Sequence, residues 1–126
     1  MAVLGVGIDI VAVARVEALL ARHGERALRR LFTPGERTLA TTHAFPAVHL
    51  AARLAAKEAA YKALSGGEDA RGIGWTEIEV ERQSDGRPVL RFHGRAASSL
   101  RSIGGTRCHL SLTHTAGVAA AVVIIE

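Results

Sequence analysis

The stretch "PAVHLAARLAAKEAAYKALSGG", residues 46–67, decides the fold expected for this chain. Proline is well tolerated in the first turn of a helix and Ser-Gly-Gly is a typical stop, so we expect one helix from Pro46 to about Leu64. Alanine and leucine fill most of this stretch, and both favour helix. The length and the small side chains predict a central helix packed closely against a sheet.

The segments before this helix predict one strand and two shorter helices. An apolar run at residues 3–10 indicates a buried strand that ends near Asp9. Residues 13–24 have apolar side chains at helical spacing and end on a glycine. The "TPGE" at 33–36 has the spacing of a capping box, so we assign its threonine and glutamate a structural role.

The segments after the helix predict two hairpins. Alternating runs at 76–82 and 87–93 flank an Asp-Gly turn, which is a hairpin signal. A short helix is expected at 95–104, and 107–114 with 117–126 form a second hairpin. This order of elements indicates an α+β fold with a largely antiparallel sheet, packed on the long helix as a single domain spanning the whole chain, from residue 1 to 126.

Composition favours a globular protein with acidic partners. The chain is 48% hydrophobic and 22% charged, with a formal net charge of +4. No apolar run approaches the roughly 20 residues of a membrane span, and no signal peptide is recognisable. A single cysteine, Cys108, cannot form an internal disulfide, so we expect a cytoplasmic protein. The positive charge favours nucleic acid, a phosphorylated ligand or an acidic protein as partner.

Lysine occurs only at positions 57 and 62, on either side of Glu58, whereas every other basic residue except histidine is arginine. Glu58 and Lys62 could be an ordinary surface pair, which stabilises a helix only slightly. The helix leaves a narrow polar strip, however, and its charged residues Arg53, Lys57, Glu58 and Lys62 must share that strip or its edges. One acid among three cations suits a polyphosphate, and a lysine can donate a proton to a leaving group.

Asp9 and Glu58 are the candidate metal ligands. Asp9, at the predicted strand end, is either a helix N-cap or a carboxylate placed for a ligand. Magnesium binds one or two carboxylates together with phosphate oxygens, so both acids could hold it against a diphosphate. His114, in the turn "SLTHTAG", is either a solvated residue or, with Thr113 and Thr115, a grip for a terminal phosphate.

Several other active-site motifs are missing from the sequence. It has no G-x-x-x-x-G-K-[ST] loop, no H-E-x-x-H, no G-x-S-x-G elbow and no Cys/His ligand spacing. Its two early glycines lack the third glycine of a dinucleotide fingerprint. Hydride transfer, zinc chemistry and serine hydrolysis are therefore disfavoured.

Longer segments follow the pattern of a known family. The segments "GVGIDIVAVARVE", "LFTPGE", "LAARLAAKEAAYKAL", "GIGWTEIEV", "DGRPVL" and "SLTHTAGVAAAVVI" resemble, in order and spacing, holo-[acyl-carrier-protein] synthase, the short bacterial type of 4′-phosphopantetheinyl transferase. The resemblance covers almost the whole chain. Its most specific elements are G-x-D-x-x-x-x-x-R, which holds Asp9 and Arg15, and K-E-A-x-x-K, which holds Glu58 and Lys62.

This resemblance implies an enzyme that transfers the phosphopantetheine arm of coenzyme A to a serine of an apo acyl carrier protein, releasing adenosine 3′,5′-bisphosphate. Asp9 and Glu58 would hold magnesium. Glu58, directly or through a metal-bound water, would help to deprotonate the serine, and Lys62 would stabilise or protonate the leaving phosphate. Phosphoryl transfer depends mainly on positioning and charge neutralisation, so one metal and a few cations suffice.

The resemblance also implies a nucleotide site. Arg53, His114 and Thr115 match positions associated with the coenzyme A nucleotide and its 3′-phosphate, and Lys62 joins them as a cofactor-binding residue. Leucine stands at position 54, where an aromatic residue is common in the family. Segment 41–49 follows no family pattern, and we assign neither of its histidines to a ligand.

Carrier docking and assembly are implied in the same way. The basic residues Arg15, Arg22 and Arg26 match the helix that docks the acidic carrier protein. The family is typically a homotrimer with its sites at subunit interfaces. Charge complementarity of this kind mainly speeds encounter and selects partners.

Two other functions stay open on the sequence alone. A basic nucleic-acid-binding module could use the arginine-rich segment 15–30, but low aromatic content and interspersed acids argue against it. A catalytically silent relative could bind coenzyme A or a carrier protein without transfer, although intact Asp9, Glu58 and Lys62 argue against that. We expect neither a nucleic-acid nor a membrane partner.

Overall fold

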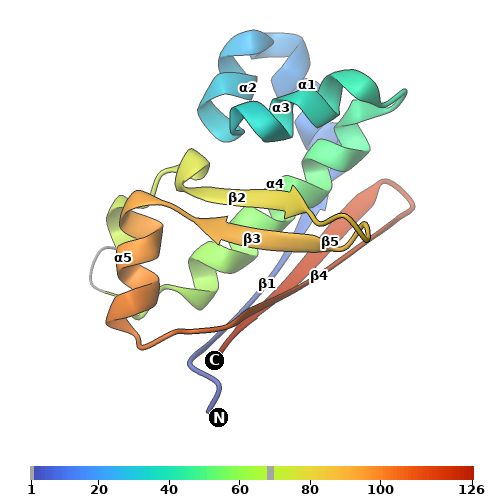
Figure 1. Cartoon of the computed structure of the whole chain (residues 1–126). Helices are drawn as coiled ribbons and strands as arrows, with labels where there is room; N and C mark the ends of the chain where they lie inside the picture. The colour runs from blue at the N-terminus through green and yellow to red at the C-terminus, as the bar shows by residue number, and fades with distance from the viewer. Residues whose placement is uncertain (1, 68–69) are drawn as a thin grey trace.

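The computed structural model describes residues 2–67 and 70–126 and shows long helix α4 between two antiparallel sheets (Figure 1). The elements, in order, are β1 (Gly5–Ala12), α1 (Val13–His23), α2 (Glu25–Leu31), α3 (Pro34–Thr42), α4 (Pro46–Ala63), η1 (Ala70–Gly72), η2 (Trp75–Glu77), β2 (Ile78–Arg82), β3 (Pro88–Phe92), α5 (Gly94–Ser102), β4 (Cys108–Thr115) and β5 (Val118–Ile125). Within the described ranges, no helix is both long and apolar enough to cross a membrane.

The sheets confirm the α+β prediction. One sheet has the order β1-β5-β4 and the other is the β2-β3 hairpin, and all of these pairings are antiparallel. Helix α4 packs on β1 and β5 and also contacts β2, while α1, α2 and α3 gather around one end of it (Figure 1). Both predicted hairpins and the predicted limits of α4 are confirmed within a few residues.

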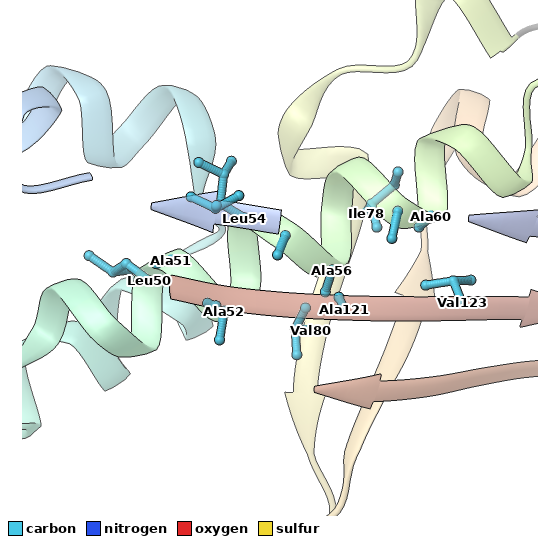
Figure 2. Close-up of a cluster of buried hydrophobic side chains, with 14 of the residues drawn as sticks. Leu50, Ala51, Ala52, Leu54, Ala56, Ala60, Ile78, Val80, Ala121 and Val123 are labelled. Carbon is cyan, nitrogen blue, oxygen red and sulfur yellow. The ribbon is translucent and has the colours of Figure 1, made fainter. Parts of the chain in front are cut away.

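Small residues bring α4 very close to the sheet. A Cβ atom added at Gly5 or Gly7 of β1 would overlap the carbonyl oxygens of Ala63 and Ala59. Figure 2 shows the alanines of α4 meeting the sheet, with Ala121 of β5 among their neighbours. Because β1 and α4 are so close, a β1 side chain that faces the helix can contact the side chains of α4.

Strand β1 is longer than predicted, and this changes the position of Asp9. The strand continues to Ala12 because β5 pairs with it along its whole length, with Asp9 opposite Ala121. The prediction that the strand ends near Asp9 is wrong. Asp9 is therefore neither a helix N-cap nor a strand tip but an internal residue of a fully paired strand.

A second helix, α2, was also missed. Gly24, the predicted stop of the helix before it, has φ of 50° and gives its N–H to the carbonyl oxygen of Leu20. Glycine adopts this left-handed conformation without a steric penalty, so the chain turns there and starts a new helix one residue later. The sequence predicted the end of α1 at Gly24 but not the second helix, α2, that begins at Glu25.

The capping box at Thr33 and Glu36 is confirmed, and it has a further partner. Both reciprocal hydrogen bonds of the box are present. Glu36 is completely buried, accepts the N–H of Val80, and lies 2.7 Å from the Nζ atom of Lys57. It thereby connects α3, α4 and β2.

Lys57 belongs to this buried connection rather than to a polar strip. Its side chain is only 1% exposed, and Nζ also donates to the carbonyl oxygens of Trp75 and Ile78 at 2.9 and 2.8 Å. Arg53, one turn earlier, is buried as well. The prediction that both share the strip with Glu58 is wrong, because residues 53 and 57 lie on the side of α4 that the other elements cover.

Candidate active site

Strand β1 and helix α4 bring together three of the predicted catalytic residues. Asp9 lies in the row of β1 residues that faces α4, and Glu58 and Lys62 lie one turn apart on the helix side nearest to it. Lys62 Nζ donates to Asp9 Oδ1 at 3.0 Å and to the carbonyl oxygen of Ile8 at 2.9 Å. The Asp9 and Glu58 carboxyl groups lie close enough for each to change the pKa of the other.

Burial and like charge make this carboxyl pair hold a proton. Burial, followed by the hydrogen bond and charge of Asp9, raises the pKa of Glu58 to about 7, against the opposing effect of Arg15. Burial also acts to raise the pKa of Asp9, but hydrogen bonds with Glu58 and Lys62 outweigh it and the pKa is lowered. Two adjacent carboxylates avoid ionising together, so below about pH 7 the pair holds one proton, mainly on Glu58.

The pair fits a magnesium ion. Asp9 Oδ2 is buried, and no donor in the described part of the chain bonds it, so a protonated Glu58, a water molecule or a cation would satisfy it. Across residues 2–67 and 70–126, no cluster of three or more His, Cys, Asp or Glu side chains could hold a metal. Magnesium typically uses one or two carboxylates and completes its shell with water and phosphate oxygens. Asp9 and Glu58 suit an ion that is shared with a phosphorylated substrate.

A cleft of about 390 Å³ opens beside this pair. Glu58 and Lys62 line its polar end, while Tyr61, Ile73 and Trp75 supply much of its apolar wall. The residues around η1 and η2 were not predicted to line a site. Their sequence signals are a pair of large apolar residues, Ile73 and Trp75, in a glycine-rich stretch, and the family-like segment "GIGWTEIEV" that contains both. The cleft can hold a long ligand that has a charged end and an uncharged arm.

The structure places Arg53 and His114 elsewhere, around the far side of α4. Arg53 is five residues from Glu58, or about 140° around the helix, since a turn takes 3.6 residues. His114 lies in the sheet row of the buried residues Val11 and Ala119, which faces the helix. Thr115, the next residue, is exposed and points to the opposite face of the sheet. The predicted nucleotide residues therefore do not meet the carboxyl pair within this chain.

A basic group of side chains surrounds Arg53. Burial lowers the pKa of His49, and the charges of His43, Arg53, Arg82 and His114 lower it further. Arg53 donates from Nη1 to the carbonyl oxygen of His49 at 3.1 Å, but its buried Nε meets no acceptor in the described part of the chain. This basic cluster is suited to bind an anion.

The predicted docking arginines lie along α1 and α2. Arg15 bonds Glu58 at 3.3 Å and so connects α1 to the carboxyl pair. Arg15, Arg26 and Arg30 line a groove of about 370 Å³ whose floor includes Leu19, Leu31 and Leu54. Arg22 is exposed on α1 but does not line this groove.

Comparisons with known proteins agree with this arrangement. Residues 5–122 match the model of the 4′-phosphopantetheinyl transferase superfamily. The chain is 45% identical over 124 residues to a holo-[acyl-carrier-protein] synthase of Koribacter versatilis (strain Ellin345), covering 98% of each. It superposes on the ACPS–CoA complex of Chronobacterium ammoniagenes with a TM-score of 0.85 and 33% identity, covering 100% of this chain and 98% of that one.

A second solved structure points the same way. Helicobacter pylori holo-[acyl-carrier-protein] synthase, solved in complex with coenzyme A, matches with a TM-score of 0.80 and 27% identity, covering 96% of this chain and 99% of that chain. Sequence, family model and fold thus agree over nearly the full length. The chain belongs to the holo-[acyl-carrier-protein] synthase family of 4′-phosphopantetheinyl transferases.

Proposed function

We propose that this chain transfers the 4′-phosphopantetheine group of coenzyme A to a serine of an apo acyl carrier protein, releasing adenosine 3′,5′-bisphosphate. The observation that carries the proposal is the Asp9–Glu58 carboxyl pair, bonded to Lys62 at the mouth of the cleft. We further propose that the enzyme acts in the cytoplasm.

Asp9 and Glu58 would hold magnesium, which neutralises diphosphate charge when bound. The serine oxygen attacks the phosphorus that carries the pantetheine arm. A new P–O bond forms as the bond to the departing nucleotide phosphate breaks, and Glu58 takes the serine proton. Without metal the pKa of Glu58 is about 7, and a bound magnesium would lower it, which favours the carboxylate form that a base needs near neutral pH. The ammonium group of Lys62 faces the leaving phosphate, where it donates a proton to that phosphate or neutralises its negative charge.

Arg53 and His114 are proposed to bind the coenzyme A nucleotide, with the 3′-phosphate as their main target. Thr115, on the other face of β4, is proposed to contact a nucleotide bound with a neighbouring subunit. Because Arg53 and Glu58 lie on different sides of α4, we propose that one coenzyme A contacts two subunits of a homotrimer. An exposed apolar row supports this assembly: Val6, Ile8 and Ile10 on the outer face of β1 are 59%, 62% and 65% exposed. Such rows on a soluble protein mark contact surfaces. We expect native mass spectrometry to give three chains, and Ile10→Asp to dissociate them.

The groove along α1 and α2 is the proposed docking surface for the acidic carrier protein. Arg15 and Arg26 lie on its rim, and Leu19 and Leu54 lie in its floor. Rim charges of this kind accelerate encounter, while an apolar floor supplies burial. Arg15 also contacts Glu58, so a carrier held here would present its serine next to the proposed base.

The test is an intact-mass measurement. A panel of apo carrier proteins is incubated with coenzyme A and magnesium, and we expect at least one carrier to gain the mass of one phosphopantetheine group. Chelation of the metal should abolish the gain. No gain on any carrier, together with retained binding of coenzyme A, would identify a silent binder and contradict the proposal.

A further inference from the structure

We propose that His43 and His49 extend the nucleotide phosphate site and make its grip on the 3′-phosphate depend on pH. The inference rests on the proposed function, in which Arg53 and His114 bind that phosphate. It concerns two residues that the family pattern leaves without a role.

The two imidazoles form one unit. Their ring centroids lie 3.8 Å apart with an interplanar angle of 26°, so the rings are stacked. His43 follows α3 and His49 lies in the second turn of α4, and both are half-buried. The carbonyl oxygen of His49 accepts the Nη1 hydrogen bond of Arg53, which joins the stack to the buried guanidinium.

The residues around the two stacked histidines are mostly basic, so they favour the binding of an anion. Burial and four basic groups are the main influences on His49: His43 from the α3–α4 connection, Arg53 from α4, Arg82 from the end of β2 and His114 from β4. Glu36 is the carboxylate whose charge reaches Arg53, but it is already bonded to Lys57.

The Nε atom of Arg53 is the second observation that points to a ligand. Arg53 is only 3% exposed, and its Nε meets no acceptor among the residues described. Burying a guanidinium donor without a partner is costly, and a phosphate oxygen would satisfy it. A phosphate that reaches this donor also enters the basic cluster that contains the stack.

The sign of the pH dependence follows from the charges. Burial and the neighbouring basic groups lower the pKa of His49, so it is neutral in the free protein at neutral pH and above. A doubly charged phosphate favours the imidazolium, so its binding takes up a proton. The grip should therefore weaken as pH rises from about 6.5 to about 8, a range in which the phosphate itself stays mostly doubly charged.

The experiment compares adenosine 3′,5′-bisphosphate with adenosine 5′-monophosphate, which differs only in the 3′-phosphate. Calorimetric titration of the full chain at about pH 6.5 and about pH 8 gives the affinity ratio of the two nucleotides. We expect this ratio to fall about tenfold over the range, since one linked proton gives at most tenfold per pH unit. His49→Gln should remove most of the fall, and His43→Gln, which removes the stacking partner that holds His49 in place, should reduce it.

A matched control is His93→Gln. His93 bonds Glu79 at 2.9 Å outside the cluster, and glutamine can keep that bond. We expect this variant to retain the full pH dependence. A ratio that does not change with pH, or equal pH dependence in wild type and both cluster variants, would overturn the inference.

The mass assay separates this inference from the proposed function. Transfer with a ratio independent of pH overturns only the histidine assignment. A pH-dependent ratio whose change with pH is smaller in both variants, without transfer to any carrier, supports the anion site and removes the proposed reaction. Circular dichroism of each variant confirms that the comparison is between folded proteins.

Discussion

Lys57 and Lys62 lie on the same helix, five residues apart, in two very different environments. Lys57 is 1% exposed and has three partners: Glu36 and two backbone carbonyl oxygens. Lys62 is 55% exposed and contacts Asp9 and a single carbonyl oxygen at the edge of a cleft. The fully satisfied lysine holds elements together, whereas the accessible one keeps a donor available for a ligand.

The same contrast holds for the two sides of α4. The Glu58 side carries a carboxyl pair in which the pKa of Glu58 is raised to about 7, and Asp9 Oδ2 has no donor in the described part of the chain. Such incompletely satisfied groups are expensive to maintain and are typical of functional sites. Lys57 also lines the cleft, but its Nζ is satisfied by Glu36 and two carbonyl oxygens, so this network is complete without a ligand. Arg53, one turn earlier, differs from it, because its buried Nε meets no acceptor among the residues described. The predictions below test whether chemistry and stability separate along this division.

The largest expected effect is on transfer, at the open side of α4, which is the side that carries Glu58 and Lys62. Glu58→Gln removes the proposed base and one of the two metal ligands, so we expect transfer to fall by about 10³-fold or more. The fold should survive, because Glu58 is partly exposed and the change removes a group that repels Asp9 when it is ionised. Single-turnover mass measurements give the rate, and a thermal melt gives the stability. Near wild-type transfer would mean that the metal assignment is wrong.

The two lysines provide the next comparison. Lys57→Met leaves Glu36 as a buried, unpaired carboxylate, so we expect a loss of about 3–5 kcal/mol in the free energy of unfolding. Lys62→Met should barely change stability, since exposed pairs contribute about 0–1 kcal/mol. Urea denaturation measures both. The double variant Lys57→Met/Glu36→Gln should recover part of the loss, because it removes the stranded charge.

Transfer rates should show the reverse order. Lys62→Met removes the group that faces the leaving phosphate, so we expect a drop of about 10²-fold in single-turnover transfer. A folded Lys57→Met/Glu36→Gln variant should retain most of its activity. If the double variant loses activity as fully as Lys62→Met does, then the closed side of α4 has a catalytic role that its geometry does not indicate.

The sequence predicted the features that depend on local signals and missed those that depend on contacts between distant segments. The long helix, both hairpins and the capping box were predicted because each depends on local signals such as periodicity, turn residues and capping spacing. The end of β1 was not, because Asp9 stays in the strand through pairing with β5, a partner more than a hundred residues away. Tertiary pairing overrides local tendency in such cases.

The candidate site was predictable in part. Asp9, Glu58 and Lys62 meet as expected, because a helix places residues four apart on one side and glycines bring β1 close. The role of Lys57 was not readable, because its partner Glu36 belongs to a different helix. Nothing local distinguishes a lysine that finds a buried carboxylate from one that meets solvent.

The stability of the protein should depend on pH through the carboxyl pair on the open side of α4. Glu58 has its pKa raised to about 7 in the folded protein, so without magnesium its contribution to stability is present at low pH and is lost as pH rises through that value. Asp9 has a lowered pKa and acts oppositely, but only in the more acidic range. We expect the melting temperature to fall from about pH 5 to about pH 8 without metal, and magnesium to reverse part of this fall. Glu58→Gln should remove both effects.

The smallest expected effect concerns the groove that continues from the open side along α1 and α2. Arg26 lines it, whereas Arg22 is exposed on α1 outside it. Arg26→Glu should raise KM for the carrier protein about tenfold at low salt with little change in kcat, because a rim charge acts mainly on encounter. Arg22→Glu should have a weaker effect, and Arg101→Glu on α5 serves as the charge-matched control. Both differences should shrink as salt screens the charges. Equal effects at positions 22, 26 and 101 would show that only overall charge matters, and the groove would then have no part in carrier selection.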